Sequence, residues 1–377
     1  MQAITEDASP RSEHKDSKRL VNRDKGEQIG TVNNVEKQSP GKLQKNIKHV
    51  VKNEAEGEAS KQLDGRWKEA VDTEVKVSLK QLLQFERTGH VLVRQLVPEE
   101  AMEECAEEIW AAAREQELEA YRHRVAVLCP GVDASSVSNI EQALAVLAEH
   151  ATDELGFLQM FNLHRYSRTV RELVTSPRLA RVAADLLGAS KVRLYQDCLF
   201  LKQPGFGATN WHSDLNMVPL DTNAFVTLWI PLRAMDEDDS GLLFASGSHR
   251  DFSLAYWQDL EGMEDLERRE YLLEDHGALD LGDATCHHGW CLHYASPQPE
   301  DSDARAALSI SYFADGARVL DTRHARRKPH DEDAWSFRGW RQALREGDLA
   351  NHPLLPLVYP AALNDRKDVT KRKKTRR

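Results

Sequence analysis

Residues 209–219 read TNWHSDLNMVP, and they lie within a series of short apolar runs that decides the fold. The runs follow one another from Lys191 to Val319, separated by Gly, Pro, Asp and Ser residues. They are VRLYQDCLFLKQPG (192–205), ATNWHSDLNMVP (208–219), FVTLWIPLRAM (225–235), SGLLFASGSH (240–249), ATCHHGWCLHYA (284–295) and AALSISYFADGARV (306–319). Short runs punctuated by turn residues are typical of strands in an antiparallel sandwich or barrel.

Helices are expected on the N-terminal side of these strands. The best defined one has Ser176 as its N-cap, Pro177 at its first position and Gly188 at its end. The elements expected are a helix over 78–86, a strand over 90–97, and helices over 99–122, 139–150 and 177–187. The acidic segment 254–275 is interpreted as a surface helix, with a lid over a binding site as the alternative. We therefore expect an α+β protein, mainly β, with helices first and a double-sheet barrel second.

The charge is distributed unevenly along the chain of 377 residues. Residues 1–70 hold 14 Lys/Arg and 12 Asp/Glu without sustained apolar periodicity, so we expect a disordered polar tail. Residues 366–377 form a second, basic tail that ends in KRKKTRR. Residues 71–365, interpreted as one domain with its barrel core at about 190–320, keep 28 basic and 48 acidic residues. Such an acidic body repels phosphate backbones, which disfavours nucleic acid as a partner.

The sequence also bears on the cellular compartment. No stretch approaches the ~20 apolar residues of a membrane span, and the N-terminus lacks the apolar core of a signal peptide. The five cysteines form no CxxC pair, which favours reduced thiols in a cytosol-like compartment. We therefore expect a cytoplasmic protein without a membrane partner, with a nuclear address in the basic tail as the alternative.

A histidine two residues before a carboxylate occurs four times, at His14/Asp16, His212/Asp214, His249/Asp251 and His330/Glu332. The first pair lies in the polar tail and the last in a run of charged residues, so neither has apolar neighbours that would exclude water from a metal site. His249 follows turn residues and is kept as a less favoured candidate for a metal ligand. His212 and Asp214 lie in a strand-like run, where side chains two residues apart project from one face. They would supply two ligands of the 2-His-1-carboxylate triad that binds Fe(II) and leaves three positions open.

The third ligand is expected in GDATCHHGWCLHYASP, residues 282–297, where the candidates are His287, His288 and His293. His293 is favoured, because it follows the apolar WCL and precedes small residues. His288, five residues earlier, would lie on the opposite face of a regular strand and is interpreted as a packing residue. A lone histidine here would more often be an ordinary core residue.

Arg305, twelve residues after His293, opens an apolar strand and is a poor surface residue. Its planar guanidinium suits the distal carboxylate of 2-oxoglutarate, while the 2-oxo acid end of that cosubstrate chelates iron. The alternative for Arg305 is a surface ion pair.

These blocks, in this order, resemble the phytanoyl-CoA dioxygenase family of Fe(II)- and 2-oxoglutarate-dependent oxygenases, from roughly Leu79 to Val319. The resemblance implies a double-stranded β-helix (a cupin-like jelly roll) flanked by N-terminal helices. It implies that His212, Asp214 and His293 are catalytic iron ligands, that Arg305 anchors 2-oxoglutarate, and that His288 is not a ligand. Trp229 falls in the strand that lines the cosubstrate pocket in relatives, although a core tryptophan is the alternative. The peroxisomal signals of the founding member are absent, and Asp214 stands where halogenating relatives have a small residue.

We therefore expect a dioxygenase that uses Fe(II), 2-oxoglutarate and O₂, with ascorbate as a supporting reductant. It would hydroxylate a small-molecule or acyl substrate and release succinate and CO₂. The oligomeric state expected is a monomer. Two alternatives remain, namely a non-catalytic binding or scaffold protein that retains the fold, and an iron oxygenase that acts on a macromolecule.

Overall fold

The computed structural model describes residues 66–151, 155–237, 239, 241–251, 269–320 and 334–360. The basic tail over 366–377 and almost all of the polar tail over 1–70 lie outside these residues, as does most of the segment 254–275. Two ends of these segments are described. Arg66–Val71 form helix α2, ahead of the boundary expected at residue 71. Leu272–Glu274 form strand β8, where a helix was expected.

A large antiparallel sheet forms the centre of the molecule. Its strands follow the order β1-β9-β6-β11-β3-β13, and β2 also pairs with β3. The bounds are β1 (His90–Val93), β2 (Leu158–Phe161), β3 (Val192–Lys202), β6 (Phe225–Pro231), β9 (Ala284–His288), β11 (Arg305–Ala314) and β13 (Leu357–Tyr359). β1 is half as long as the strand expected over 90–97, because Gln95 adopts a left-handed conformation (φ 48°) that a strand does not accommodate.

Alternation along these strands gives the large sheet two different faces. Val226, Leu228 and Ile230 of β6 belong to the main apolar core that is shared with the helices. Thr227 and Trp229, between them, therefore face the other way. The same pattern holds on β11, where Leu308 and its alternate neighbours are apolar and the residues between them include Arg305, Ser309 and Ser311. The inner face of the sheet thus carries a row of polar side chains on its central strands.

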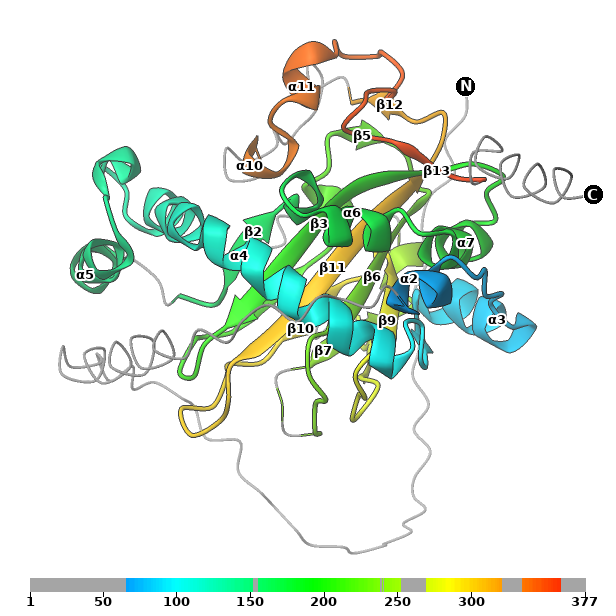
Figure 1. Cartoon of the computed structure of the whole chain (residues 1–377), viewed down its shortest axis with the longest axis horizontal. Coiled ribbons are helices and arrows are strands. Elements are labelled where there is room, and N and C mark those ends of the chain that lie inside the picture. Colours follow the sequence, from blue (N-terminus) through cyan, green and yellow to red (C-terminus); the bar gives the residue numbers. More distant parts are fainter. Residues whose placement is uncertain are drawn as a thin grey trace, which may run out of the picture.

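Helices cover the apolar face of the large sheet. They are α2, α3 (Leu79–Thr88), α4 (Glu99–Leu128), α6 (Arg168–Val174) and α7 (Pro177–Leu187), and α5 (Ile140–His150) packs against α4. Figure 1 shows the long α4 crossing in front of the sheet. The caps expected for α7 are confirmed, since the Ser176 side chain accepts from Leu179 N and Gly188 is left-handed (φ 59°). α4 runs past the predicted end at Arg122 to Leu128, because no helix-breaking residue precedes Pro130.

A smaller antiparallel sheet faces the inner side of the large one. Its order is β4-β10-β7-β8, with β4 (Thr209–His212), β10 (His293–Ala295) and β7 (Leu242–Ser246) beside β8. His90 of β1 stacks on Phe244 of β7, with ring centroids 4.5 Å apart, so the inner faces of the two sheets meet. The run over 284–295, expected as one strand, supplies β9 to the large sheet and β10 to the small one. The expected α+β, mainly β class is confirmed.

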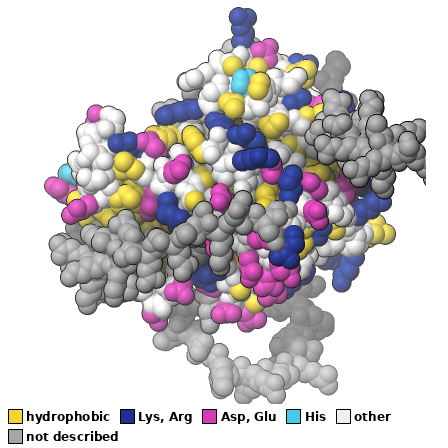
Figure 2. All heavy atoms as spheres, viewed as in Figure 1, with side chains coloured by type: hydrophobic (Ala, Val, Ile, Leu, Met, Phe, Trp, Pro, Cys, Tyr) yellow, Lys and Arg dark blue, Asp and Glu magenta, His cyan; other side chains and the backbone are white. Residues whose placement is uncertain are grey.

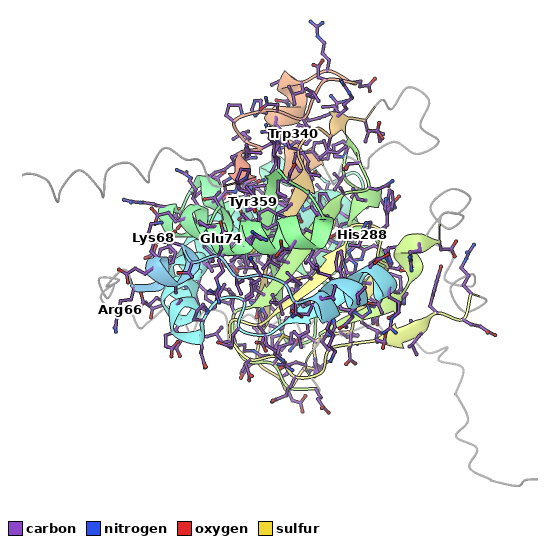
Figure 3. The ribbon with its side chains drawn as sticks, turned by 90° about the vertical axis from the view of Figure 1, so that its right-hand side faces the viewer. Arg66, Lys68, Glu74, His288, Trp340 and Tyr359 are labelled. Atoms are coloured by element: carbon purple, nitrogen blue, oxygen red, sulfur yellow. The ribbon has the colours of Figure 1, made fainter. Side chains whose placement is uncertain are left out.

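Residues 334–360 close one end of the double sheet. Trp340 is buried against Tyr195 and belongs to an apolar cluster with Phe225 and Phe337 (Figure 3). The remaining elements are α10 (Ala334–Phe337), α11 (Trp340–Ala343), β5 (Leu220–Asp221), β12 (Arg318–Val319), and the single turns η2 (Ala134–Ser136), η3 (Leu163–Arg165), η4 (Asp214–Asn216) and η5 (Ser248–Arg250). β5 and β12 pair in a third, two-stranded sheet.

The surface of the helical side is mixed in charge. In Figure 2, acidic and basic side chains alternate over the described part of this face rather than forming one continuous basic surface. Within the described residues, no helix combines the length and the apolar character needed to cross a membrane.

Candidate metal centre

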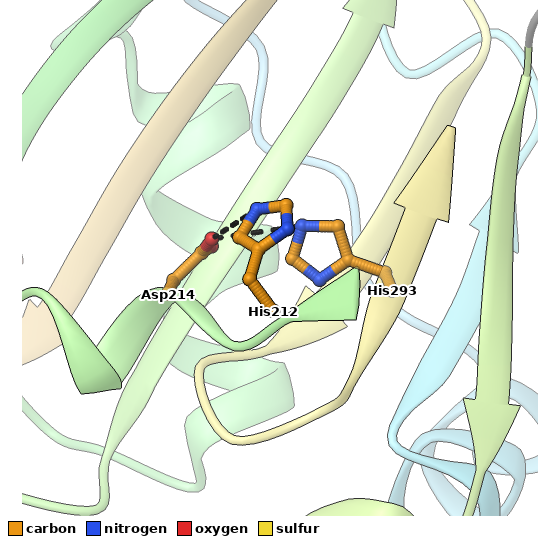
Figure 4. Close-up of side chains that lie close together, drawn as sticks. All are labelled: His212, Asp214 and His293. Atoms are coloured by element: carbon orange, nitrogen blue, oxygen red, sulfur yellow. Dashed lines mark ion pairs between the residues drawn. The ribbon is translucent and has the colours of Figure 1, made fainter. Parts of the chain in front are cut away.

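Three ligand-type side chains meet between the two sheets (Figure 4). His212 ends β4, Asp214 begins η4, and His293 begins β10 directly opposite His212 in the sheet register. One ligand atom from each residue lies within 4.8 Å of the other two. The Asp214 Oδ1 atom is 3.6 Å from His293 Nε2 and 4.0 Å from His212 Nε2. The structure therefore brings together the three residues that the sequence nominated as ligands.

The reason expected for this convergence was wrong in part. His212 and Asp214 were placed on one strand, where alternation would align their side chains. β4 ends at His212, and Asp214 instead opens the turn η4. A backbone hydrogen bond from Leu215 N to Gly289 O (2.9 Å) holds this turn against the end of β9. The carboxylate thus reaches the imidazoles from a turn rather than from a shared strand face.

Backbone carbonyl groups orient both imidazoles. His212 Nδ1 lies 2.8 Å from Asn210 O, and His293 Nδ1 lies 3.0 Å from Cys291 O. A carbonyl oxygen only accepts, so each Nδ1 carries the proton and donates. This tautomer leaves the Nε2 lone pair of each ring facing Asp214, which is the arrangement that metal-ligating histidines adopt.

Asp214 is held by its other oxygen. Its Oδ2 atom accepts hydrogen bonds from Thr227 Oγ1 (2.6 Å) and His287 Nε2 (3.1 Å). Thr227 Oγ1 also lies 3.0 Å from Ser311 Oγ. His287, Thr227 and Ser311 are direct neighbours across β9, β6 and β11, on the inner face of the large sheet. This row fixes the carboxylate so that Oδ1 alone points to the two histidines.

The electrostatics of the three groups suit a divalent cation. Burial lowers the pKa of His212 and of His293, so both rings are neutral at neutral pH. Burial opposes ionisation of Asp214, but the hydrogen bond from His287 and the nearby imidazoles outweigh it and lower the pKa of the carboxyl group. Neutral imidazole and ionised carboxylate are the forms that bind metal. Two imidazoles and one carboxylate with open positions fit Fe(II).

The role of His287, which holds the Asp214 carboxylate, was not predicted from the sequence. This residue was considered as a ligand, but the structure places it behind Asp214, with its ring centroid 4.4 Å from that of His293. The next residue, His288, faces the opposite way and packs near helix α3, with its ring 6.2 Å from that of Phe85 (Figure 3). His249 lies beside His288 on η5 and is not part of the cluster. Alternation within β9 points the side chains of these two neighbouring histidines to opposite faces of the sheet. The sequence did not show where β9 ends and β10 begins, so it did not predict which face His287 takes.

Arg305 and Trp229 lie together on the same inner face. The Arg305 side chain is buried, at 2% exposure, and its guanidinium carbon is 5.3 Å from the centre of the Trp229 ring. Trp229 pairs with Ser309 across the sheet, two residues from the Thr227–Ser311 pair that holds Asp214. The two side chains therefore lie toward one end of the face that carries the metal-type cluster.

Known proteins provide an independent comparison. The model of the family described as phytanoyl-CoA dioxygenase matches residues 85–306. Among solved structures, the non-heme alpha-ketoglutarate-dependent carbocyclase SnoK from nogalamycin biosynthesis is 21% identical, with a TM-score of 0.55, over 76% of this chain and 99% of its own. EctD from S. alaskensis, solved with 2-oxoglutarate and 5-hydroxyectoine, is 19% identical over 70% of this chain and 86% of its own, with a TM-score of 0.47.

The search of curated protein sequences found no significant match. The likeness to SnoK shows the fold and confirms the expected jelly roll with N-terminal helices. The family match extends over more than half of the chain, from the end of α3 to the start of β11, and includes the cluster of His212, Asp214 and His293. The chain therefore belongs to the phytanoyl-CoA dioxygenase family, an enzyme family of Fe(II)- and 2-oxoglutarate-dependent oxygenases.

Proposed function

We propose that this protein is a dioxygenase that hydroxylates a small-molecule or acyl substrate, with 2-oxoglutarate as cosubstrate. The observation that carries the proposal is the convergence of His212, Asp214 and His293 within 4.8 Å, from segments far apart in the sequence. When bound, Fe(II) supplies the redox chemistry by which O₂ oxygenates a substrate C–H bond and converts 2-oxoglutarate to succinate and CO₂.

The chain positions and shields this reaction. His212 and His293 present Nε2 to the metal, and Asp214 presents Oδ1, because Thr227 and His287 occupy its Oδ2. The buried fork of Arg305 pairs with the distal carboxylate of 2-oxoglutarate, a bidentate contact that guanidinium geometry favours. Trp229, beneath that guanidinium, forms an apolar wall and excludes water from the ion pair. Presence of the carboxylate ligand supports hydroxylation rather than halogenation.

The test is turnover of 2-oxoglutarate by the purified full chain. The protein is incubated with Fe(II), ascorbate, O₂ and 2-oxoglutarate, and succinate is measured with and without a panel of small acids and acyl compounds. We expect wild-type protein to form succinate, faster with a matching substrate, and Asp214→Ala to form none above background, because it lacks one ligand.

A second measurement separates the alternatives. Binding of Mn(II) to wild-type protein, followed by calorimetry, should be lost in Asp214→Ala. Equal metal binding and equal succinate formation by the two proteins would instead support the scaffold alternative. Succinate formation stimulated by a nucleic acid or a protein, and by no small compound, would replace the small-molecule assignment with the macromolecular one.

A further inference from the structure

The ligand cluster is more exposed on one side than on the other. The side chain of His212 is 27% exposed, whereas those of His293 and His287 are 6% and 2% exposed. His212 belongs to β4, which is an edge strand of the small sheet with β10 as its neighbour. The open side of the ligand cluster is therefore the side of the free edge of β4.

This free edge faces the β3 and β2 side of the large sheet. β7 lies over β1, because His90 stacks on Phe244, and β10 lies over β9, because the rings of His287 and His293 are 4.4 Å apart. The turn after β4 is hydrogen-bonded to Thr227 of β6. The small sheet ends at β4, but the large sheet continues through β11 to β3 and β2. The inner faces of β3 and β2 therefore lie beside the open side of the ligand cluster.

The inner face of β2 is aromatic and accessible. Leu158 and Met160 of β2 are buried in the core under the helices. Phe157, Gln159 and Phe161 alternate with them and therefore project from the inner face. All three side chains are half-buried. Accessible apolar side chains that are grouped beside a few polar ones are typical of a ligand-binding surface.

Helices α4 and α10 add aromatic rings to the border of this face. The ring of His123 in α4 is 5.9 Å from that of Phe161 and 5.1 Å from that of Trp335 in α10. The ring of Trp335 is half-buried. A flat ring bound on β2 would thus meet Phe161 and Trp335, and aromatic rings pack favourably edge to face or offset.

Cations beside this face lie over its aromatic rings. The guanidinium carbon of Arg124 is 4.9 Å from the centre of the Phe157 ring, and that of Arg338 is 4.3 Å from the centre of the Trp335 ring. A carboxylate or phosphate that bound these guanidinium groups would compete with the cation–π contacts. The face therefore favours an uncharged ligand.

Gln196 of β3 supplies a polar group beside the aromatic rings. It pairs with Ser311 across the β3–β11 register, and Ser311 contacts Thr227, which holds Asp214. Gln196 thus lies in the same row of the inner face as the ligand cluster. Its Oε1 atom is buried and has no hydrogen-bond partner among the described groups. Because a buried acceptor without a donor is costly, an N–H or O–H group of a ligand would stabilise this site.

We propose that the substrate is an uncharged aromatic compound with an N–H or O–H donor, bound on the inner face of β2 and β3. The proposal deepens the function proposed above and rests on it. Phe161 and Trp335 pack against the substrate ring, and Gln196 Oε1 accepts a hydrogen bond from its donor. Since Gln196 shares a row with the ligand cluster, this hydrogen bond directs the ring toward the open side of that cluster.

The experiment measures binding of simple probes to full-length protein loaded with Mn(II) and 2-oxoglutarate. The probes are 2-naphthol, 2-methoxynaphthalene, 2-naphthoate and hexanoyl-CoA. Mn(II) broadens the NMR signals of a compound that binds close to it, and Zn(II)-loaded protein is the diamagnetic control. We expect the strongest broadening for 2-naphthol and less for 2-methoxynaphthalene, which has the same ring without a donor. The two charged probes should bind more weakly than 2-naphthol.

Two variants test the two kinds of contact. Gln196→Met should weaken 2-naphthol binding roughly 3- to 10-fold, as for a lost neutral hydrogen bond, and should leave binding of 2-methoxynaphthalene unchanged. Phe161→Leu should weaken binding of both compounds by a similar factor, about 3- to 10-fold, because it removes a ring contact. The matched control is Gln84→Met on α3, which covers the other face of the sheet, and it should bind every probe like wild type.

The outcomes separate the substrate class from the proposed function. Equal 2-naphthol binding by wild type, Gln196→Met and Phe161→Leu would overturn the placement on β2 and β3. Stronger binding of hexanoyl-CoA or 2-naphthoate, or no broadening of either uncharged probe, would overturn the substrate class. Succinate formation stimulated by other compounds would then leave the proposed function standing. If wild-type protein formed no succinate with any compound, the proposed function would fail, and the substrate class with it.

Discussion

At the scale of single residues, the two oxygens of Asp214 have different tasks. Oδ2 is held by Thr227 and His287, and this leaves Oδ1 for the metal. Thr227→Val keeps the shape of the side chain and removes its donor. We expect it to weaken Mn(II) binding by about 10- to 100-fold, the usual effect of losing a partner that orients a metal ligand. Calorimetric titration with Mn(II) measures this loss without any turnover.

Thr285 provides a matched control for that substitution. It is also a buried threonine on the inner face, one strand away, and its Oγ1 atom has no hydrogen-bond partner among the described groups. Thr285→Val should therefore bind Mn(II) like wild type. Equal affinities for Thr227→Val and Thr285→Val would show that the hydrogen bond to Asp214 does not orient the ligand.

At the scale of elements, the turn η4 depends on close packing against Gly289 at the end of β9. A Cβ atom at Gly289 would lie 2.6 Å from Leu215 Cγ and 2.9 Å from Phe225 Cδ1, closer than such atoms approach. Gly289→Ala should therefore push Leu215 and the adjacent Asp214 away from the histidines. We expect the free energy of unfolding to drop by about 1–3 kcal/mol, as for other overpacked sites, and Mn(II) affinity to drop as well. Urea unfolding and metal titration measure the two effects.

Gly241 serves as the comparison for this substitution, because a Cβ there would meet nothing closer than 4.0 Å. Gly241→Ala should retain both stability and metal affinity. A Gly289→Ala protein that matched it in both measurements would contradict the tight packing of η4 on β9.

The elements that could be predicted from the sequence are those with local signals. The limits of α7 follow from Ser176, Pro177 and Gly188, which act on their own helix ends. The break between β9 and β10 could not be predicted in this way. Gly289, at the break, has no left-handed φ, and a glycine is needed there because Leu215 packs against it in the folded protein. The three residues that converge in the cluster were nominated as ligands from their types and apolar setting. The hydrogen bond from His287 to Asp214 depends on the register of β9, β6 and β11, and the local sequence does not predict that register.

At the scale of the whole molecule, a buried histidine, His90, and a half-buried one, His276, join the two sheets. His90 of β1 contacts Ser246 of β7 through Nε2 (2.7 Å) and His276 through Nδ1 (3.1 Å). Ser246 donates in turn to Glu274 of β8. Burial, with smaller effects from neighbouring charges, lowers the pKa of His90 to about 3 and that of His276 to about 4. The contact between the sheets therefore depends on neutral imidazoles.

This arrangement predicts that the metal-free protein loses stability in mild acid. Below about pH 6.5 the unfolded chain binds protons at His90 and His276 that the folded chain does not bind, so unfolding is favoured as pH falls toward about 4. Each histidine contributes a slope on the order of 1 kcal/mol per pH unit. Urea unfolding between these pH values should therefore show a shallower slope for the double variant His90→Gln/His276→Gln, even if its stability at neutral pH is lower. His150→Gln, at an exposed site that ends α5, should keep the wild-type slope, and a double variant that kept it too would show that the two sheets do not separate through these histidines.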